Sequence, residues 1–504
     1  MKFIDNILDS LTMYRLVLYY LIVLLSAAVM LSLVGMLPYS PISLIFSTLF
    51  LVAVCWITNK IFAYTFNAPT NIESVFISAL ILALILSPIK SFSGLPLLFW
   101  AAVLSMASKY ILAINQKHIF NPVAVAVALT AFGFDGSPSW WIGTMSMLPF
   151  SLLGIVIVRK VRAYNLVLCF LLVSCIAMLG ISFLQGSNVL TTLKQIISSS
   201  PIFFFAFIML TEPLTTPPTK KLQSLYAVLV GLLFAPQFHI GSFNTTPETA
   251  LVIGNIFSYL VSPKWKIIST MQQKIHIAPT MLELLFNPNK KLAFSPGQYM
   301  EWTLPHKNPD SRGNRRYFTI ASSPTEDALR LGVKLNLNGS SYKRAMAAMH
   351  TNTLLVGTQL AGDFILPKDT KQKLVFIAGG IGVTPFRSMI KYLVDLQQQR
   401  PIVLFYANKT VDEIVYGDVF NQAQAELGIK IVYTLTDESK IPTGWQGKVG
   451  RVDADMIVQE VPDFMERKFY LSGPHAMVGA YEEVIRNMGV SNDNIKIDFF
   501  PGFV

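Results

Sequence analysis

The chain has 504 residues, of which 53% are hydrophobic and only 14% are charged, so it is too long and too apolar for one soluble domain. Its net charge of +11 does not indicate nucleic-acid binding, because the basic residues of the first half lie between apolar runs rather than in one patch. The cysteines Cys55, Cys169 and Cys175 lie in apolar runs without a CxxC pair, which argues against a disulfide framework and predicts no metal site.

Apolar runs dominate residues 1–263. A helix needs about 20 apolar residues to cross a bilayer, so we expect a polytopic membrane domain of about ten helices. The first run is too long for a signal peptide and is expected to be an uncleaved anchor. The expected spans are 15–36, 41–58, 71–88, 94–114, 120–134, 140–158, 164–184, 197–210, 222–236 and 248–262.

Lysine and arginine in the loops predict the orientation. If the N-terminus is inside, the outer loops receive only Lys90 and Lys194, and the other basic residues face the cytoplasm. We therefore expect a multi-pass protein of the cell (inner) membrane, with both termini and the C-terminal half in the cytoplasm.

Two segments differ from simple lipid-facing helices. Residues 117–122 read KHIFNP, and residues 211–221 read TEPLTTPPTKK, with prolines that block a continuous helix and a glutamate at membrane depth. An ordinary helix end followed by a cytoplasmic turn is the alternative.

In their order and flanking spans, these segments resemble the NPA-type and TDPVT-type segments of one membrane family. It comprises the B subunit of sodium-pumping NADH:quinone reductase and the D subunit of the Rnf complex. The family carries flavin in the membrane, with one FMN bound covalently to a threonine in an SGAT motif. No SGAT occurs here, and if Gly143 stands for its glycine, Met145 replaces the threonine. A non-covalent flavin (FMN or riboflavin), or none, stays open.

Histidine content tests a haem-based alternative. Transmembrane ferric reductases and NADPH oxidases need paired axial histidines within their spans. The first half holds only His118 and His239, both at span edges. A bis-histidine haem relay is therefore not expected.

The pattern changes near residue 264. Alternating runs broken by proline and glycine turns predict strands at 267–277, 281–286 and 299–304, which indicate an antiparallel β-barrel over residues 264–370. Apolar runs at 374–378, 402–407, 430–434 and 469–471 indicate the buried strands of a parallel α/β domain over residues 371–504. The predicted fold is therefore multidomain, with helical membrane, β-barrel and α/β parts.

A basic and aromatic segment lies within the sequence range predicted for the barrel. Residues 316–324 read RYFTIASSP, in which Arg316 is suited to neutralising a phosphate, Phe318 to packing on a ring system and Thr319 to hydrogen bonding at a reacting atom. A basic turn and a strand would be the structural alternative. The segment resembles the flavin signature of the ferredoxin–NADP reductase superfamily, whose layout is also a barrel followed by an α/β domain.

The next segment resembles that superfamily's second flavin-phosphate segment. Lys334 leads to Gly339, Ser340 and Ser341, small residues that present backbone N–H groups to phosphate where they open a helix. A plain hairpin turn is the competing interpretation.

Residues 377–385 read IAGGIGVTP, after an apolar strand and before an expected helix. Glycines let the backbone approach a pyrophosphate, and a helix N-terminus favours its negative charge. This assigns nucleotide binding to a set of five residues, namely Gly379, Gly380, Gly382, Thr384 and Pro385.

Three later segments complete the resemblance. Tyr406 lies near a strand end, where an α/β sheet places its ligands. Residues 472–477 read SGPHAM and resemble the superfamily's CGPxxM nicotinamide segment, with Ser472 in place of the cysteine. Residues 498–503 read DFFPGF and resemble its acidic and aromatic ending. The resemblance implies a reacting centre of Thr319, Ser472 and Phe499, and further contacts from Gly473, Pro474 and Met477.

Taken together, the sequence predicts an enzyme. It is an NAD(P)H-dependent flavin oxidoreductase that uses FAD and passes electrons to a flavin or a quinone in the membrane half, alone or with other redox subunits. The alternatives are a reductase of an extracytoplasmic acceptor and a reductase merely anchored by, or gating, a transporter-like helical domain.

Overall fold

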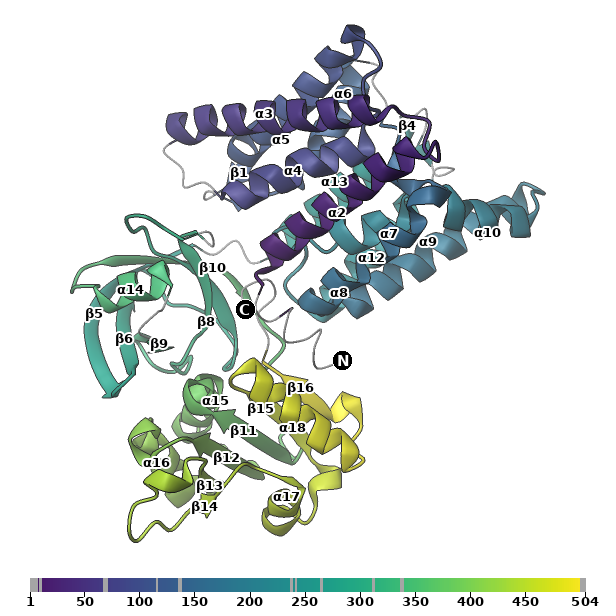
Figure 1. The fold of residues 1–504 in the computed structure, drawn as a ribbon. Coiled ribbons are helices and arrows are strands. Elements are labelled where there is room, and N and C mark those ends of the chain that lie inside the picture. Colours follow the sequence, from purple (N-terminus) through teal and green to yellow (C-terminus); the bar gives the residue numbers. More distant parts are fainter. Residues whose placement is uncertain are drawn as a thin grey trace. The chain divides into compact units, whose positions relative to one another are not determined.

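The computed structural model describes residues 8, 11–66, 71–114, 117–134, 138–235, 239–240, 243–262, 266–310, 313–335 and 340–498. The described residues form two compact units, one up to residue 262 and one that contains most of those from residue 266 onward. Figure 1 shows the helical unit in purple to teal and the second unit in teal-green to yellow.

The first unit is helical wherever apolar residues run long enough. Its elements are α2 (Met13–Leu33), α3 (Pro41–Thr65), α4 (Ile72–Ile85), α5 (Leu95–Ile111), β1 (Ala113–Ile114), β2 (Lys117–His118), α6 (Pro122–Phe134), α7 (Leu148–Leu152), α8 (Ile155–Val161), α9 (Tyr164–Leu184), α10 (Val189–Ser198), α11 (Ile202–Phe204), the π-helical turn η4 (Phe205–Met209), α12 (Lys220–Leu233), β3 (His239–Ile240), β4 (Phe243–Asn244) and α13 (Pro247–Val261).

Among the described residues, four helices are long and apolar enough to cross a bilayer: α2, α3, α9, and α5 with the turn before it. The pair 189–198 and 202–209 could add a fifth span, bent by 58°. The expectation of about ten spans is therefore not met by length, because helices such as α4 and α12 have 14 residues and rise only about 21 Å.

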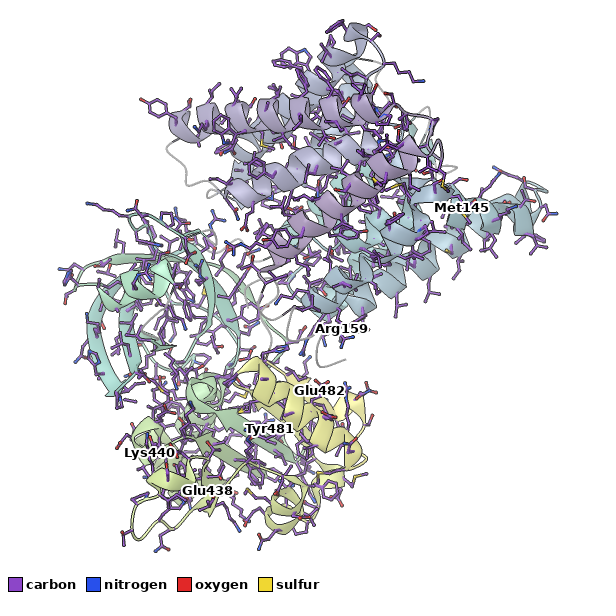
Figure 2. The ribbon with its side chains drawn as sticks, viewed as in Figure 1. Met145, Arg159, Glu438, Lys440, Tyr481 and Glu482 are labelled. Atoms are coloured by element: carbon purple, nitrogen blue, oxygen red, sulfur yellow. The ribbon has the colours of Figure 1, made fainter. Side chains whose placement is uncertain are left out.

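The predicted span 140–158 was wrong as one helix. It is divided into short turns, η2 (Trp141–Gly143) and η3 (Met145–Met147), followed by α7 and α8. Pro149 lies in the first turn of α7, which begins at Leu148, and a proline there prevents a regular helix from continuing through it. Met145, the residue compared with the SGAT threonine, is 63% exposed (Figure 2).

One arrangement occurs twice in the first unit. A helix, a two-stranded hairpin and a helix that starts at proline follow one another as α5, β1–β2 and α6, and again as α12, β3–β4 and α13. The two proline-started helices are in contact, and the Asn121 N–H donates to Asn255 Oδ1 at 2.7 Å between them.

The second unit begins with a six-stranded antiparallel sheet of order β8-β7-β10-β5-β6-β9. Its elements are β5 (Ile267–Ala278), β6 (Met281–Pro288), β7 (Tyr299–Thr303), β8 (Arg315–Thr319), β9 (Leu329–Lys334), α14 (Ser341–Ala347) and β10 (Leu354–Ala361). The edge strands β8 and β9 approach one another, because the Ala321 N–H donates to the Arg330 carbonyl at 2.9 Å. The three barrel strands predicted from alternation are confirmed.

A six-stranded parallel sheet of order β14-β13-β12-β11-β15-β16 follows. Its elements are β11 (Leu374–Gly379), α15 (Thr384–Asp395), β12 (Ile402–Asn408), α16 (Gly417–Leu427), β13 (Lys430–Leu435), β14 (Lys448–Val449), α17 (Ala454–Glu460), β15 (Lys468–Ser472), α18 (His475–Asn487) and β16 (Ile495–Ile497). The four predicted buried strands are confirmed as β11, β12, β13 and β15.

Strand alternation explains the two cores of this sheet. Leu374 and Phe376 face a core shared with α15 and α16, whereas Val375 and Ile377 face α17 and α18. Tyr481 of α18 is 5% exposed in the second core, while its neighbour Glu482 pairs with Arg486 (Figure 2). An antiparallel sheet followed by a parallel α/β sheet is the layout that the sequence predicted for this half of the chain.

Candidate functional site

Arg316 of β8 is held in one orientation. Its side chain is 8% exposed, its Nη2 donates to Asp310 Oδ1 at 2.8 Å, and its guanidinium lies 5.3 Å from the centre of the Tyr342 ring. Burial and a fixed ion pair pre-organise the charge that the sequence assigns to a phosphate.

Ser341, which opens α14, joins Arg316 through the same aspartate. The Ser341 N–H donates to Asp310 Oδ2 at 3.1 Å, and the Asp310 N–H donates to Ser341 Oγ at 2.8 Å. His306 Nε2 lies 3.1 Å from that hydroxyl. The structure thus brings together the two segments that the sequence assigned to a flavin phosphate. Ser340 caps the N-terminus of α14, because its hydroxyl accepts the Lys343 N–H. Gly339 lies outside the described residues.

Phe318 and Thr319 project to opposite faces of β8 because successive strand residues alternate. The Phe318 ring lies 6.0 Å from Tyr342, on the face that also holds Arg316. Thr319 is 6% exposed at the end of the strand, paired with Tyr299 of β7. Because Phe318 and Thr319 lie on opposite faces, both side chains can contact the same ligand only if that ligand lies at the end of β8.

Lys334, which the sequence assigns to a flavin phosphate, forms an ion pair in the structure. Its Nζ lies 3.1 Å from Glu413 Oε1, which belongs to the loop after β12 in the parallel sheet. The pair is partly exposed and therefore weak, so the phosphate contact of Lys334 stays a prediction.

The glycine turn is built by close contact with the Ser472–Met477 segment. A Cβ at Gly382 would lie 2.5 Å from Gly473 Cα, and one at Gly379 would lie 2.2 Å from Met477 Sδ and 3.4 Å from Pro474 Cδ. Residue 382 must be glycine because it meets backbone, whereas the contact at residue 379 is with the flexible end of the Met477 side chain. The nucleotide turn and the nicotinamide segment, about 90 residues apart in sequence, therefore form one surface.

The backbone at Gly380 has free space beside it. Its φ is +52°, a conformation that favours glycine, and a Cβ there would meet only Met281 Cε at 3.9 Å. Thr384 and Pro385 follow at the start of α15, with proline in the first turn of the helix, where it is tolerated. This geometry fits a pyrophosphate bound by backbone N–H groups at a helix start.

Tyr406 is a core residue, not a surface contact. Its side chain is fully buried, its hydroxyl accepts the Val415 N–H at 3.3 Å, and its ring packs on Phe420 and Tyr433. The assignment of Tyr406 to the coenzyme is corrected for this reason: a ring with no exposed surface cannot touch a ligand. The strand end itself is formed by Asn408.

Ser472, at the end of β15, is 1% exposed, and its hydroxyl donates to Asp498 Oδ2 at 2.9 Å. Burial raises the pKa of Asp498 to about 7, and the hydrogen bond from Ser472 opposes that rise. Burial, and after it the carboxylates of Asp498 and Asp363, raise the pKa of Tyr299. Asp498 therefore lies near both Ser472 and the strand that pairs with Thr319. Phe499 lies outside the described residues.

The two unusual segments of the first unit meet each other. Glu212 Oε1 lies 3.3 Å from His118 Nε2, and Glu212 Oε2 accepts from Asn121 Nδ2 at 2.9 Å. Asn255 Nδ2 extends this polar group to the Tyr226 hydroxyl at 3.3 Å. We name these five residues the polar centre. An ordinary helix end followed by a turn would not require such contacts between segments about 90 residues apart.

Some residues of the site were not assigned from the sequence. Asp310 and His306 act through long-range contacts, and Glu326 joins the two sheets of the second unit through Arg387. Of the unassigned residues, only Asp498 belongs to a sequence motif, because it is the acidic residue of the DFFPGF segment. Among the described residues, no three histidine, cysteine, aspartate or glutamate side chains are grouped for a metal ion.

Comparison with known proteins agrees with this geometry. Residues 376–483 match the family model described as "Oxidoreductase NAD-binding domain". A flavohemoprotein of Oceanobacillus iheyensis is 27% identical over 213 residues, which cover 41% of this chain and 51% of that protein. The F subunit of the Na(+)-translocating NADH-quinone reductase of Serratia proteamaculans is 30% identical over 145 residues, which cover 28% of this chain and 35% of that protein.

A solved cytochrome P450 reductase from Amycolatopsis aligns with a TM-score of 0.43 and 24% identity, over 47% of this chain and 71% of that one. The chain spans about half the length or less of the two curated relatives named above. The family model and the two curated relatives show that the second unit resembles NAD(P)H-dependent oxidoreductases. More particularly, it is similar to the flavohemoprotein and to the reductase F subunit named above.

Proposed function

We propose that this protein is a membrane-bound flavoprotein oxidoreductase. Its second unit takes hydride from NADH or NADPH onto FAD, and its first unit holds the flavin or quinone that next receives the electrons. The observation that carries the proposal is the contact between the backbones of Gly382 and Gly473, because it joins a pyrophosphate turn to a nicotinamide segment.

Each residue has a role that follows from its position. Arg316 and the Ser341 N–H would bind the flavin's phosphate groups, and the N–H groups of residues 379–382 would bind the pyrophosphate of NAD(P)H. The Thr319 hydroxyl would hydrogen-bond at the flavin edge, and Phe318 would pack beside it. When bound, the two coenzymes supply the redox chemistry, in which hydride passes from nicotinamide to flavin.

Ser472 and Asp498 supply a proton-holding group beside the nicotinamide segment. A carboxyl with a pKa of about 7 exchanges a proton in the physiological range, and the Ser472 hydroxyl orients it at 2.9 Å. Their place near Tyr299, which pairs with Thr319, supports a role at the reacting centre.

The first unit supports a membrane location by its four long apolar helices. The polar centre supports a binding site there for a second, non-covalent flavin (FMN or riboflavin) or for a quinone, because carbonyl-rich rings need hydrogen-bond donors such as His118 and Asn121. A multi-pass arrangement in the cell membrane, with the second unit in the cytoplasm, would give the coenzyme access. Other redox subunits could share the electron path.

An experiment on the full chain in proteoliposomes tests the coupling of the two units. NADH or NADPH is added outside, and reduction of a quinone dissolved in the bilayer is compared with reduction of soluble ferricyanide. The proposal expects both reactions, with flavins found by mass spectrometry of the purified protein. Ferricyanide reduction without quinone reduction would favour a reductase that the helices merely anchor.

A further inference from the structure

The two sheets of the second unit are joined beside the residues that carry chemistry. On the barrel side, residues 321–326 come directly after Thr319 and Ile320 at the end of β8. On the nucleotide side, α15 comes directly after the glycine turn of residues 380–383. A contact between these two stretches therefore acts within a few residues of both predicted coenzyme sites.

Arg387 of α15 makes the principal contact. It is 4% exposed, its Nη1 donates to the Ala321 carbonyl at 3.0 Å, and its two Nη atoms bind both carboxylate oxygens of Glu326, with Nη2 to Oε1 at 2.9 Å. The Ser388 hydroxyl donates to the Ser322 carbonyl at 2.6 Å. A bidentate pair of this kind fixes orientation as well as distance.

Each partner of the pair is also fixed within its own sheet. Glu326 Oε2 accepts the Ser323 N–H at 2.7 Å, and Glu326 Oε1 accepts from Arg330 Nε at 3.1 Å. The Arg387 guanidinium lies 5.6 Å from the centre of the Tyr416 ring, and Tyr416 has a φ of +60° at the start of α16. A non-glycine residue in that conformation costs free energy and persists only where its surroundings hold it.

We propose that Arg387 and Glu326 are a positioning pair that sets the separation between the flavin-binding end of β8 and the glycine turn that binds NAD(P)H. The inference rests on the proposed function. Hydride transfer moves two electrons and one proton from the nicotinamide ring to the flavin, and its rate falls steeply when the two rings are misplaced. A displacement of about 1 Å can cost on the order of 100-fold in rate.

The position of the pair explains why it is charged. An apolar pair of similar volume would also join two sheets, and buried ion pairs give stability no better than such a replacement. A guanidinium fork admits only one relative placement of its carboxylate, so it limits sliding between the sheets. Lys334 and Glu413 also join the sheets, but their side chains are 31% and 19% exposed and they meet through one contact of 3.1 Å.

The test uses the full-length holoprotein and the variants R387K, E326Q and R387M/E326M. Anaerobic stopped-flow mixing with NADH or NADPH gives the limiting rate of flavin bleaching, its dependence on coenzyme concentration, and the isotope effect with coenzyme deuterated at C4. Flavin content and the Tm are measured for every variant. The matched control is E460Q, because Glu460 also binds two cations, Lys430 and Lys448, and is 15% exposed like Glu326, but lies within the α/β domain.

The expected result is a limiting bleaching rate lowered about 10-fold or more in R387K and E326Q, with flavin content and half-saturating coenzyme concentration within about twofold of the wild type. The isotope effect should rise, because the chemical step becomes slower. R387M/E326M should have the wild-type Tm but a lower limiting rate of flavin bleaching. E460Q should bleach at the wild-type rate.

The inference is overturned if NADH or NADPH bleaches the flavin of R387K and E326Q at the wild-type rate, whatever the Tm of these variants. It is also overturned if R387M/E326M restores the rate, since packing alone would then suffice. These outcomes differ from failure of the proposed function, in which the wild-type flavin itself is not bleached by either coenzyme.

Discussion

Asp310 holds Arg316 and Ser341 with its two carboxylate oxygens, at 2.8 Å and 3.1 Å. The aspartate thus stands between the guanidinium and the N–H that the proposed function gives to the flavin phosphates. A carboxylate and a phosphate are both anions, so they compete for the same donors.

Replacing Arg316 should remove flavin. R316A deletes the buried charge, and R316K keeps a charge but loses the planar fork that Asp310 now binds. We expect R316A to lose most of its flavin on gel filtration and R316K to bind FAD about 10-fold more weakly, equal to ~1.4 kcal/mol. The flavin-to-protein ratio and fluorescence titration of the apoprotein check this, and full flavin retention in R316A would contradict the assignment.

Asp310→Asn should have the opposite effect. The amide keeps an acceptor for the Ser341 N–H but removes the negative charge beside Arg316, so FAD should bind more tightly by roughly 1 kcal/mol, or about fivefold in Kd. The same fluorescence titration, done at low and high salt, measures it. Weaker binding would instead mean that Asp310 orders the site rather than competing for it.

Gly382→Ala should separate the two coenzyme sites. Its Cβ would lie 2.5 Å from Gly473 Cα and 2.6 Å from Gly473 N, and both contacts are with backbone that has little room to move. We expect bleaching by NAD(P)H to slow at least about 10-fold while the flavin content stays unchanged. The control is G479A in α18, where a Cβ meets no heavy atom within 4 Å.

Asp498→Asn should remove a pH dependence of stability. Burial raises the pKa of Asp498 from 3.8 to about 7 in the folded protein, so its contribution to stability is fully present below about pH 4 and is lost as the pH rises through about 7. D498N has no such group, so its Tm relative to the wild type should rise between about pH 4 and pH 7 and stay constant above. A Tm difference that does not vary with pH would contradict the assigned pKa.

Glu212→Gln tests the polar centre of the first unit. It removes the charge bound by His118 and Asn121, and we expect quinone reduction to fall at least about 10-fold while ferricyanide reduction is unchanged. The matched control is E73Q, because Glu73 is 14% exposed and pairs with Arg15 at 2.9 Å in the same unit. Equal losses of quinone reduction in both variants would show only general damage to the helices.

The strands and the glycine turn could be predicted because their signals are local. Alternation of apolar residues marks β5 and β6, and a strand, three glycines and a proline in order mark the turn at 379–385. Tyr406 was assigned wrongly because a motif locates a strand end but not the face on which each side chain lies. Strand alternation places Leu404 and Tyr406 together in the core.

The rest depends on contacts between distant residues. Asp310 and Ser341 are 31 positions apart, and Glu326 and Arg387 are 61 apart, so no local pattern reports either pair. The helices of the first unit were overestimated because hydropathy measures apolar content but not helix breaks, such as the one before Pro149.

An anaerobic spectrum of the purified full-length protein, recorded before and after stoichiometric NADH or NADPH, tests the central claim most directly. We expect an FAD spectrum near 450 nm, about one equivalent for the second unit, that at least one of the two coenzymes bleaches within the mixing time of a hand titration. A protein without flavin, or with a flavin spectrum that neither coenzyme changes, would contradict it.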